Sequence, residues 1–205
     1  MMNKQLLRKY FIMGSQNCSK DPVRILEEAL EAGITAFQFR EKGIGSLQGK
    51  EKVELGKKLR EVCKRYQTPF ILNDDIELAD ILEVDGLHVG QDDQPVEKIR
   101  KAYPDLMIGL SISNQEELQR SPIHLVDYIG AGPIFPTTTK TDAKKAVGVK
   151  WIQTLRNQYP HLPIVGIGGI QIDNANSVME AGADGVAVIS AITEATDIKV
   201  SVEKL

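Results

Sequence analysis

Two kinds of segment alternate from one end of the chain to the other, and this alternation restricts the fold more than any other feature of the sequence. The first kind is short, apolar and rich in β-branched or aromatic residues. Near-continuous apolarity is typical of parallel strands that are covered on both faces. The sequence therefore predicts eight strands, at residues 10–14, 36–40, 70–73, 86–89, 108–112, 128–131, 163–166 and 185–189.

The second kind of segment has the spacing of an amphipathic helix. The clearest example has a charged face and an apolar face, and the residues of the apolar face are Leu55, Leu59, Val62, Cys63 and Tyr66. An earlier helix is expected to begin at Asp21 and Pro22, a capping residue followed by proline, and to end at Gly33. A later one is expected between Asp173 and Gly182.

The number of repeats then selects among α/β architectures. Eight strand–helix units in 205 residues leave about 26 residues for each, close to the minimum for a right-handed βαβ crossover. A doubly wound open sheet is the competing architecture, but it usually has about five or six strands. The sequence thus predicts an α/β fold that is a single (β/α)8 TIM barrel, one domain over residues 1–205, with the active site at the C-terminal ends of the strands.

The overall charge and hydropathy limit the partners. The formal net charge is -3, so no basic field attracts nucleic acid, and no nucleic-acid partner is expected. No run of about 18 apolar residues occurs, and residues 1–11 contain no apolar run of signal-peptide length, so we expect no membrane partner and a cytoplasmic location. A homo-oligomer stays open as an alternative, because a small barrel can bury an outer apolar patch between copies.

Glycines and polar residues gather where the predicted strands end. In a barrel the loops after the strands meet at one mouth, where such enzymes have their active sites. Gly166, Gly168 and Gly169 would let the backbone approach a ligand and point amides at a phosphate. Ile189 and Ser190, after the eighth strand, can add amides to the same place. The alternative is that these glycines only make a tight turn.

Two aspartates follow neighbouring strands. Asp74 and Asp93 come after the third and fourth strands, so their carboxylates can face one another. Two carboxylates, completed by water and phosphate oxygens, are a usual way for a protein to hold Mg2+. Helix capping is the alternative, and it is the role expected of Asp75 and Asp92.

Basic residues at the same mouth favour a phosphorylated ligand. Arg40 can offer a bidentate fork to phosphate, and Lys42 and Lys140 can reach in from two loops. The polar segment 137–147 is a candidate lid, in which Lys144 and Lys145 are expected to be solvated surface groups. One metal-assisted and one amide-based anion site together predict two phosphorylated small-molecule substrates, or one that carries phosphate at both ends.

Five short motifs occur in order along the chain, at residues 38–42, 73–75, 88–93, 132–140 and 166–170. In order and spacing they resemble the motifs of the thiamine-phosphate synthase family, over essentially the whole length. The resemblance implies a Mg2+-dependent transferase of thiamine biosynthesis. It would join 4-amino-2-methyl-5-(diphosphooxymethyl)pyrimidine to 4-methyl-5-(2-phosphooxyethyl)thiazole, through a pyrimidine carbocation, and release diphosphate.

The same resemblance implies roles for individual residues. The implied catalytic residues are Arg40, Lys42, Lys140 and Ser111. The implied contacts to the pyrimidine diphosphate are Gln38, Phe39, Arg40, Glu41, Lys42, Asn73, Ser111 and Lys140. The implied contacts to the thiazole phosphate are Thr137, Thr138, Thr139, Gly169, Ile189 and Ser190. The implied magnesium ligands are Asp74 and Asp93.

One position departs from the family pattern, and rival functions stay open. Members of the family often carry His where this chain has Ser113, and His88 is expected to be a structural strand-end residue. The nearest rival is the thiazole tautomerase branch, which shares the fold but generally lacks the full diphosphate-binding set. A non-catalytic sensor of thiamine phosphates and a sugar-phosphate epimerase are more distant alternatives.

Overall fold

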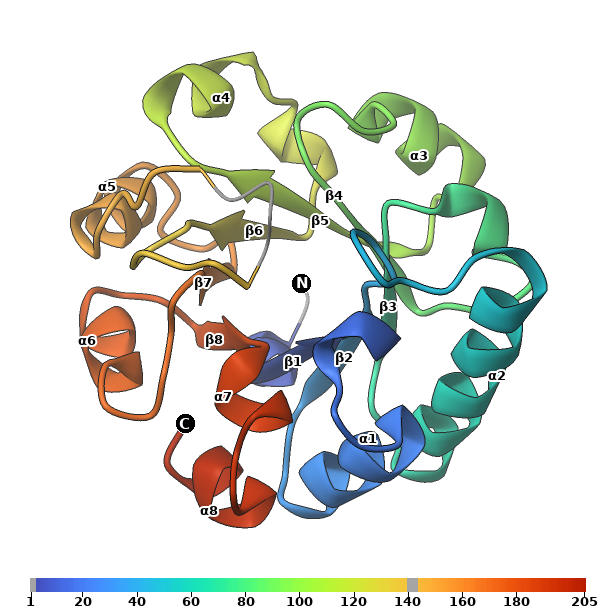
Figure 1. The fold of residues 1–205 in the computed structure, drawn as a ribbon. Coiled ribbons are helices and arrows are strands. Elements are labelled where there is room, and N and C mark those ends of the chain that lie inside the picture. Colours follow the sequence, from blue (N-terminus) through green and yellow to red (C-terminus); the bar gives the residue numbers. More distant parts are fainter. Residues whose placement is uncertain (1–2, 140–143) are drawn as a thin grey trace.

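Eight parallel strands form the centre of the molecule. The computed structural model describes residues 3–139 and 144–205 of the chain. The strands pair in chain order, and β1 also pairs with β8, so the sheet closes into a barrel that is seen along its axis in Figure 1. Their bounds are β1 Lys9–Met13, β2 Ala36–Phe39, β3 Phe70–Asn73, β4 Gly86–Val89, β5 Met107–Ile112, β6 Tyr128–Ala131, β7 Ile164–Ile167 and β8 Gly185–Val188. The predicted (β/α)8 barrel is therefore confirmed.

Helices surround the barrel on its outside (Figure 1). The α-helices are α1 Pro22–Glu31, α2 Gly49–Arg65, α3 Val96–Ala102, α4 Gln115–Arg120, α5 Lys150–Gln158, α6 Ala175–Glu180, α7 Ser190–Thr193 and α8 Ile198–Glu203. The 3-10 helices are η1 Lys4–Leu7, η2 Ser15–Asn17, η3 Ile76–Leu78 and η4 Ile123–Leu125. The expectation of eight strand–helix units is wrong at one place, because only η3 and turns connect β3 to β4.

The helix limits follow the predicted signals, with one exception. The Asp21 side chain accepts a hydrogen bond from the N–H of Val23 at the start of α1, and Gly33 beyond its end has a φ of 98°. Tyr66, expected on the apolar face of α2, instead caps its C-terminus and is 39% exposed. Its hydroxyl donates to Glu31 of α1 at 3.2 Å.

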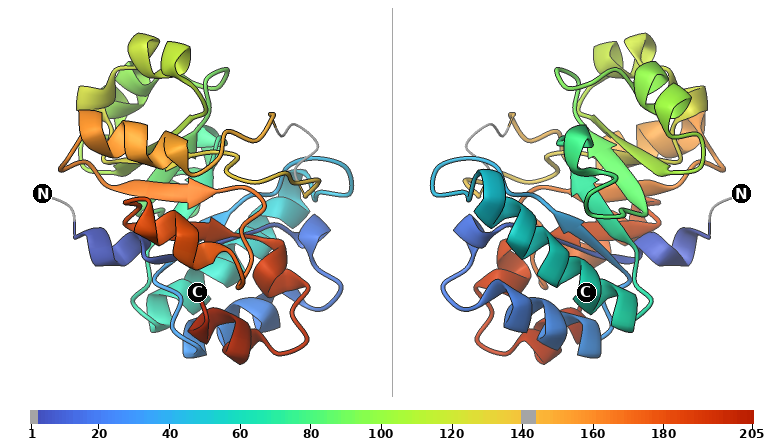
Figure 2. Two further views of the ribbon diagram at one scale, coloured as in Figure 1. Left: turned by 90° about the vertical axis from the view of Figure 1, so that its left-hand side faces the viewer. Right: turned by 90° about the vertical axis from the view of Figure 1, so that its right-hand side faces the viewer.

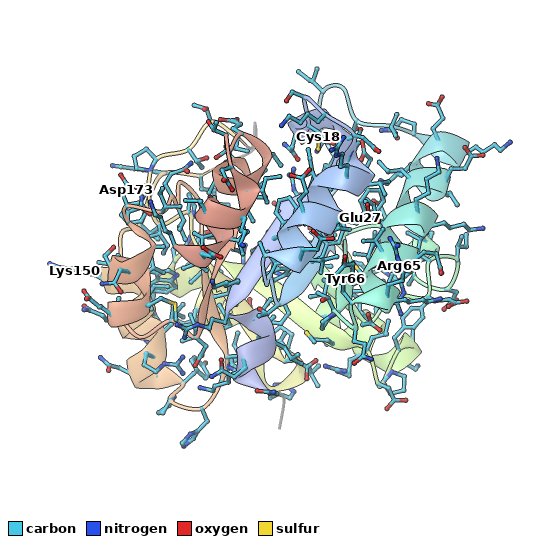
Figure 3. The ribbon with its side chains drawn as sticks, turned by 90° about the horizontal axis from the view of Figure 1, so that it is seen from below. Cys18, Glu27, Arg65, Tyr66, Lys150 and Asp173 are labelled. Atoms are coloured by element: carbon cyan, nitrogen blue, oxygen red, sulfur yellow. The ribbon has the colours of Figure 1, made fainter. Side chains whose placement is uncertain are left out.

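The outer surface of α1 and α2 is visible in Figure 3. Arg65 of α2 forms an ion pair there with Glu27 of α1. Beneath this polar surface, α2 buries Leu59, Val62 and Cys63 against the sheet. The helix thus has the predicted amphipathic character, with its apolar face ending one turn before Tyr66.

Strand alternation separates the core into two parts. Side chains that point outward pack beneath the helices, whereas those that point inward fill the barrel centre. The inward set is Leu7, Tyr10, Ile12, Ala36, Ile71, Tyr128, Val165, Ala187 and Ile189. Leu7 comes from η1, which closes the end of the barrel opposite the β2–α2 and β6–α5 connections (Figure 2).

The lower ends of the strands are joined by a repeated aspartate bridge. Asp184, just before β8, accepts hydrogen bonds from the N–H of Ile164 on β7 and from Arg156 of α5. Asp85 makes the equivalent bonds before β4, and Asp127 makes them before β6. These bridges satisfy strand N–H groups at the base of the barrel and hold each helix to the sheet. The mouth at the other end is thereby built on a rigid base.

None of the helices in the described ranges is both long and apolar enough to cross a membrane.

Candidate active site

A cavity of about 270 Å³ opens at the C-terminal ends of the strands, where the sequence predicted the site. Its wall is formed by residues that follow every strand from β2 to β8. The predicted site residues on this wall are Arg40, Lys42, Asn73, Asp74, Asp93, Ser111, Thr137, Thr139, Gly169, Ile189 and Ser190. The fold thus brings together residues as far apart in the chain as Arg40 and Ser190.

Other predicted residues lie off the cavity wall. Phe39 points outward into the core beneath the helices, with its ring centroid 6.2 Å from that of Phe70, because side chains of a strand alternate between its two faces. Gln38 points inward but lies fully buried beneath the cavity. Thr138 is exposed and off the wall, and Lys140 lies outside the described residues. A substrate contact by the Phe39 side chain is therefore excluded by its direction.

The Glu41 side chain joins loops and lies off the cavity wall, so the structure gives no support to its expected contact with substrate. Its carboxylate accepts hydrogen bonds from the N–H and the hydroxyl of Ser15 and from the N–H of Leu47. Lys52 of α2 donates to the Glu41 carbonyl at 3.0 Å and pairs with Asp75 at 2.5 Å. Asp75 stands at the expected N-cap position, before η3, but its side chain makes this ion pair and no capping hydrogen bond. The loops after β1, β2 and β3 thus support one another.

Asp74 and Asp93 do meet, and a lysine lies between them. The Lys42 Nζ is 2.5 Å from Asp74 Oδ2 and 3.8 Å from Asp93 Oδ1. Asp93 also accepts a hydrogen bond from the N–H of Gly90 at 2.7 Å. Asp74 itself has a φ of 61°, a left-handed conformation that costs energy for a residue with a side chain. Lys42 thus neutralises the two predicted metal ligands, and its expected contact with a diphosphate stays a prediction.

The proximity of the two carboxylates shifts their titration. Burial raises the pKa of Asp74 to about 6; Lys42 opposes this rise and the neighbouring Asp93 adds to it. Burial also acts upward on the pKa of Asp93, but hydrogen bonds from Asp74 and from the Gly90 N–H outweigh it and hold that pKa below its usual value. Burial acts against the Lys42 ammonium, yet the hydrogen bond and attraction of Asp74 raise its pKa. The site therefore favours one positive charge between two carboxylates.

Arg40 belongs to the same side of the cavity. It follows β2 directly, its backbone N–H donates to the Met13 carbonyl, and its side chain is only 7% exposed. The sequence placed it as the last residue of the strand, one position beyond the observed end. Lys42 lies on the same loop after β2. This wall of the cavity therefore combines two cations, Arg40 and Lys42, with the carboxylates of Asp74 and Asp93.

The opposite wall is made of backbone. The N–H groups of Gly169 and Ser190 have no acceptor among residues 3–139 and 144–205, and both residues line the cavity. A Cβ on Gly169 would lie 2.5 Å from the Pro136 carbonyl, and its φ is 64°, so glycine is required here. Gly166 is different: a Cβ there would lie 2.3 Å from the Val178 side chain of α6. Packing against α6 thus accounts for glycine at position 166, which lies off the cavity wall.

Lys144 is a cavity residue that could not be predicted from the sequence, because its partner is distant in the chain. Lys144, expected to be solvated, lines the cavity and pairs at 2.7 Å with Glu117 of α4, which is 4% exposed. Glu117 also accepts from the N–H of Ser113 at 2.8 Å and from Asn114. Nothing local in the sequence marks this pair, although a glutamate on the inner face of a short helix is an unusual feature.

Comparisons with known proteins place these residues in context. A family model described as thiamine monophosphate synthase matches residues 9–192 of the chain. The thiamine-phosphate synthase of Oceanobacillus iheyensis is 61% identical over 203 residues, covering 99% of this chain and 98% of the relative. A protein of the same name from Bacillus cereus is 53% identical over 201 residues, covering 98% and 92% of the two chains.

Solved structures are similar as well. Thiamine phosphate pyrophosphorylase from Pyrococcus furiosus superposes with a TM-score of 0.86 at 35% identity, over 98% of this chain and 95% of that one. Phosphoribosyl anthranilate isomerase from Thermotoga maritima gives a TM-score of 0.70 at 14% identity, over 97% of this chain and 96% of that one. The second likeness concerns the fold alone.

Proposed function

The chain belongs to the thiamine monophosphate synthase family, and from this premise we propose which reaction its cavity performs and through which residues. It is an enzyme of thiamine biosynthesis. The proposed reaction is a transferase reaction. It couples 4-amino-2-methyl-5-(diphosphooxymethyl)pyrimidine with 4-methyl-5-(2-phosphooxyethyl)thiazole to give thiamine phosphate and diphosphate.

The observation that carries this proposal is that two different sets of groups suited to anions line opposite walls of one cavity. Arg40 and Lys42 supply cations beside a carboxylate pair, whereas Gly169 and Ser190 supply backbone N–H groups. A diphosphate with a divalent metal fits the first wall, and a monophosphate fits the second. Two phosphorylated substrates can thus be held with their reacting ends between the walls.

The residues present fit Mg2+. Asp74 and Asp93 are hard oxygen donors in mutual contact, and the Lys42 ammonium lies 2.5 Å from Asp74, which supports the fit of a cation at this pair. The described ranges hold no group of three or more His, Cys, Asp or Glu side chains that could bind a metal, so diphosphate and water oxygens would complete the coordination. Mg2+ bound to Asp74 and Asp93 would neutralise charge on the departing diphosphate.

The reaction breaks one bond and forms another, and side chains of the protein assist both steps. The bond between the pyrimidine methylene carbon and the diphosphate oxygen breaks, and its electron pair leaves with the diphosphate. The thiazole ring nitrogen then donates its lone pair to form the new C–N bond. Arg40 and Lys42 hold the leaving diphosphate, so catalysis is electrostatic and requires no protein nucleophile. Thr137 and Thr139, at the edge of the β6–α5 connection, help to exclude water from the carbocation.

One assay tests the proposal. Purified protein is mixed with both substrates and MgCl2, and thiamine phosphate and diphosphate are measured by chromatography. We expect both products in equal amounts, and only when Mg2+ is present. A protein that forms neither product under these conditions would overturn the proposed function, and isomerisation of a thiazole carboxylate would favour the tautomerase alternative.

Arg40→Ala sharpens the same assay. Loss of a buried guanidinium that holds the leaving group should lower kcat by about 100-fold or more. Arg24→Ala removes an arginine whose side chain is 77% exposed on α1, and it should leave the rate unchanged. Equal rates for the Arg40 variant and the wild type would show that the diphosphate lies elsewhere.

We further propose that the enzyme acts in the cytoplasm, which its two unpaired cysteines, Cys18 and Cys63, support. Association into a homo-oligomer stays a prediction, for which light scattering during gel filtration is the measurement.

A further inference from the structure

A continuous chain of hydrogen bonds crosses the centre of the barrel beneath the cavity. Gln38 Nε2 donates to the Tyr10 hydroxyl at 2.8 Å, and this hydroxyl lies 2.8 Å from that of Tyr128. The Tyr128 hydroxyl lies 2.9 Å from His88 Nδ1, and His88 Nε2 lies 2.9 Å from Ser111 Oγ. We call these five residues the interior chain. They come from five strands, β2, β1, β6, β4 and β5 in this order. Of the five residues, only His88 and Ser111 line the cavity.

The barrel is built around the interior chain. Both rings pack against Gly109 on β5. A Cβ at this position would lie 2.1 Å from Tyr128 Cζ and 2.5 Å from His88 Nδ1, so no larger residue fits there. A Cβ on Gly130 of β6 would lie 2.9 Å from His88 Cε1. Barrel interiors are usually filled by branched apolar side chains, so two glycines that make room for two polar rings are a specific arrangement.

The interior chain has a direction. Gln38 Nε2 donates to the Tyr10 hydroxyl, and the arrangement in which each hydroxyl then accepts one hydrogen bond and donates one has Tyr10 donating to Tyr128. In this arrangement Tyr128 donates to His88 Nδ1, so the proton of the imidazole is on Nε2. His88 Nε2–H accordingly donates to Ser111 Oγ, and the Ser111 proton is left to point into the cavity.

The two tyrosines are suited to transmit this order. Tyr10 and Tyr128 are 1% and 0% exposed. Burial raises the pKa of the Tyr10 hydroxyl and of the Tyr128 hydroxyl well above the usual value, so both keep their protons at any ordinary pH. A buried hydroxyl that lost its partner would leave another polar atom unsatisfied, so each link constrains the next.

We propose that Tyr10 and Tyr128 are positioning residues for the reaction: they fix the His88 tautomer and thereby hold the Ser111 hydroxyl as a hydrogen-bond donor toward the pyrimidine substrate. This inference rests on the proposed function for the identity of the ligand, whose pyrimidine nitrogens accept hydrogen bonds. Neither tyrosine touches the cavity, so both act only through His88 and Ser111 or through Gln38.

The first test needs no substrate. The chain contains three histidines, and His124 and His161 are exposed, so their two tautomers exchange and average. In protein labelled with 15N-histidine, NMR should show one histidine fixed as the Nε2–H tautomer, and Tyr128→Phe should abolish this fixed state. A fixed Nδ1–H tautomer in the wild type, or an unchanged His88 signal in Tyr128→Phe, would overturn the inference.

The second test is kinetic. Tyr128→Phe and Tyr10→Phe should each lower kcat/KM for the pyrimidine diphosphate by about tenfold or more, while KM for the thiazole phosphate stays unchanged. Tyr103→Phe is the control, because it removes only a surface hydrogen bond to Asp80 at 3.3 Å, and it should keep wild-type kinetics. If Tyr128→Phe fails to fold, Tyr10→Phe still decides, because Tyr10 contacts neither His88 nor Ser111 by a hydrogen bond.

The outcomes separate this inference from the proposed function. An active wild type whose Tyr→Phe variants have unchanged kinetics for both substrates would refute the positioning role and leave the synthase reaction standing. A wild type that forms no product would refute the synthase reaction, whereas the histidine spectrum would still judge the interior chain.

Discussion

Asp74 is the residue of the site whose ionisation lowers the stability of the folded protein. Its pKa is raised to about 6 by burial, with a further contribution from Asp93. A carboxyl with a higher pKa in the folded protein binds more protons when folded than when unfolded. Its contribution to stability therefore falls as the pH rises from the unfolded value near 4 through about 6. The metal-free protein accepts this cost in order to hold two carboxylates together.

Asp74→Asn removes this cost, because an amide does not ionise. Relative to the wild type, the variant should gain about 1–2 kcal/mol of unfolding free energy between pH 4.5 and pH 8. Urea denaturation in EDTA at both pH values measures the gain. Asp92→Asn, an exposed neighbour, is the control and should show no such dependence. A gain that shrinks with rising pH would mean that the Lys42 ion pair dominates the burial of Asp74.

Among the secondary structure elements, the lower ends of the strands depend on the repeated aspartate bridge. Asp184 is 16% exposed at its side chain and joins β7 to α5 through Ile164 and Arg156. Asp184→Ala should lower the unfolding free energy by about 3 kcal/mol, because a strand N–H and a partly buried guanidinium lose their acceptor. Asp173→Ala, on the exposed surface (Figure 3), should change it by less than about 0.5 kcal/mol. Similar losses for the two variants would contradict a structural role of the bridge.

A second interaction between elements holds the β6–α5 connection to α4. Glu117 receives Lys144, the Ser113 N–H and Asn114, and its pKa is lowered: burial opposes the lowering, but Lys144 and Ser113 outweigh it. Glu117→Ala should cost about 2–3 kcal/mol of stability and raise KM for the substrates, because one wall of the cavity loses its anchor.

The fluorescence of Trp151, the single tryptophan of the chain, reports this change. Its indole N–H donates to the Ile112 carbonyl, next to Ser113. Urea titrations followed at Trp151 measure the loss of stability, and Glu116→Ala, one residue earlier and exposed, is the matched control. A Glu117 variant as stable as the control would show that Lys144 pairs only weakly.

In the whole molecule, the barrel closes where β1 meets β8, and α8 covers this seam beside α1 (Figure 1). Lys9 of β1 donates to the Val202 carbonyl of α8 at 2.6 Å, and Val202 is fully buried. Val202→Ala should lower the unfolding free energy by about 2 kcal/mol, with a single cooperative transition. Val200→Ala, in the same helix but 42% exposed, should cost less than about 0.5 kcal/mol. A larger effect at Val200 would mean that α8 buries its other face in an oligomer.

The fold could be predicted from the sequence because its signals are local. Each strand is a short apolar run, so its predicted bounds agree with the observed ones to within one residue. Asp21 and Gly33 likewise mark the two ends of α1 by the type of residue at each end. The error at Tyr66 has a local cause as well, since the helical pattern continues past the point where the backbone ends α2. The sequence could not predict that β3 is followed by the 3-10 helix η3 in place of an α-helix, because the residues of η3 also fit a helical pattern.

The sequence by itself determined the barrel and the place of the site, because periodicity and strand ends are properties of neighbouring residues. Only the tertiary structure decided what each site residue does. The alternation of side chains along β2 points Phe39 outward and Gln38 inward. Closure of the barrel brings Tyr10 of β1 within hydrogen-bonding distance of Tyr128 on β6. It also placed Lys42 between Asp74 and Asp93. The physical reason is that partners distant in the chain meet only when the eight strands close, so no pattern along the sequence records their contact.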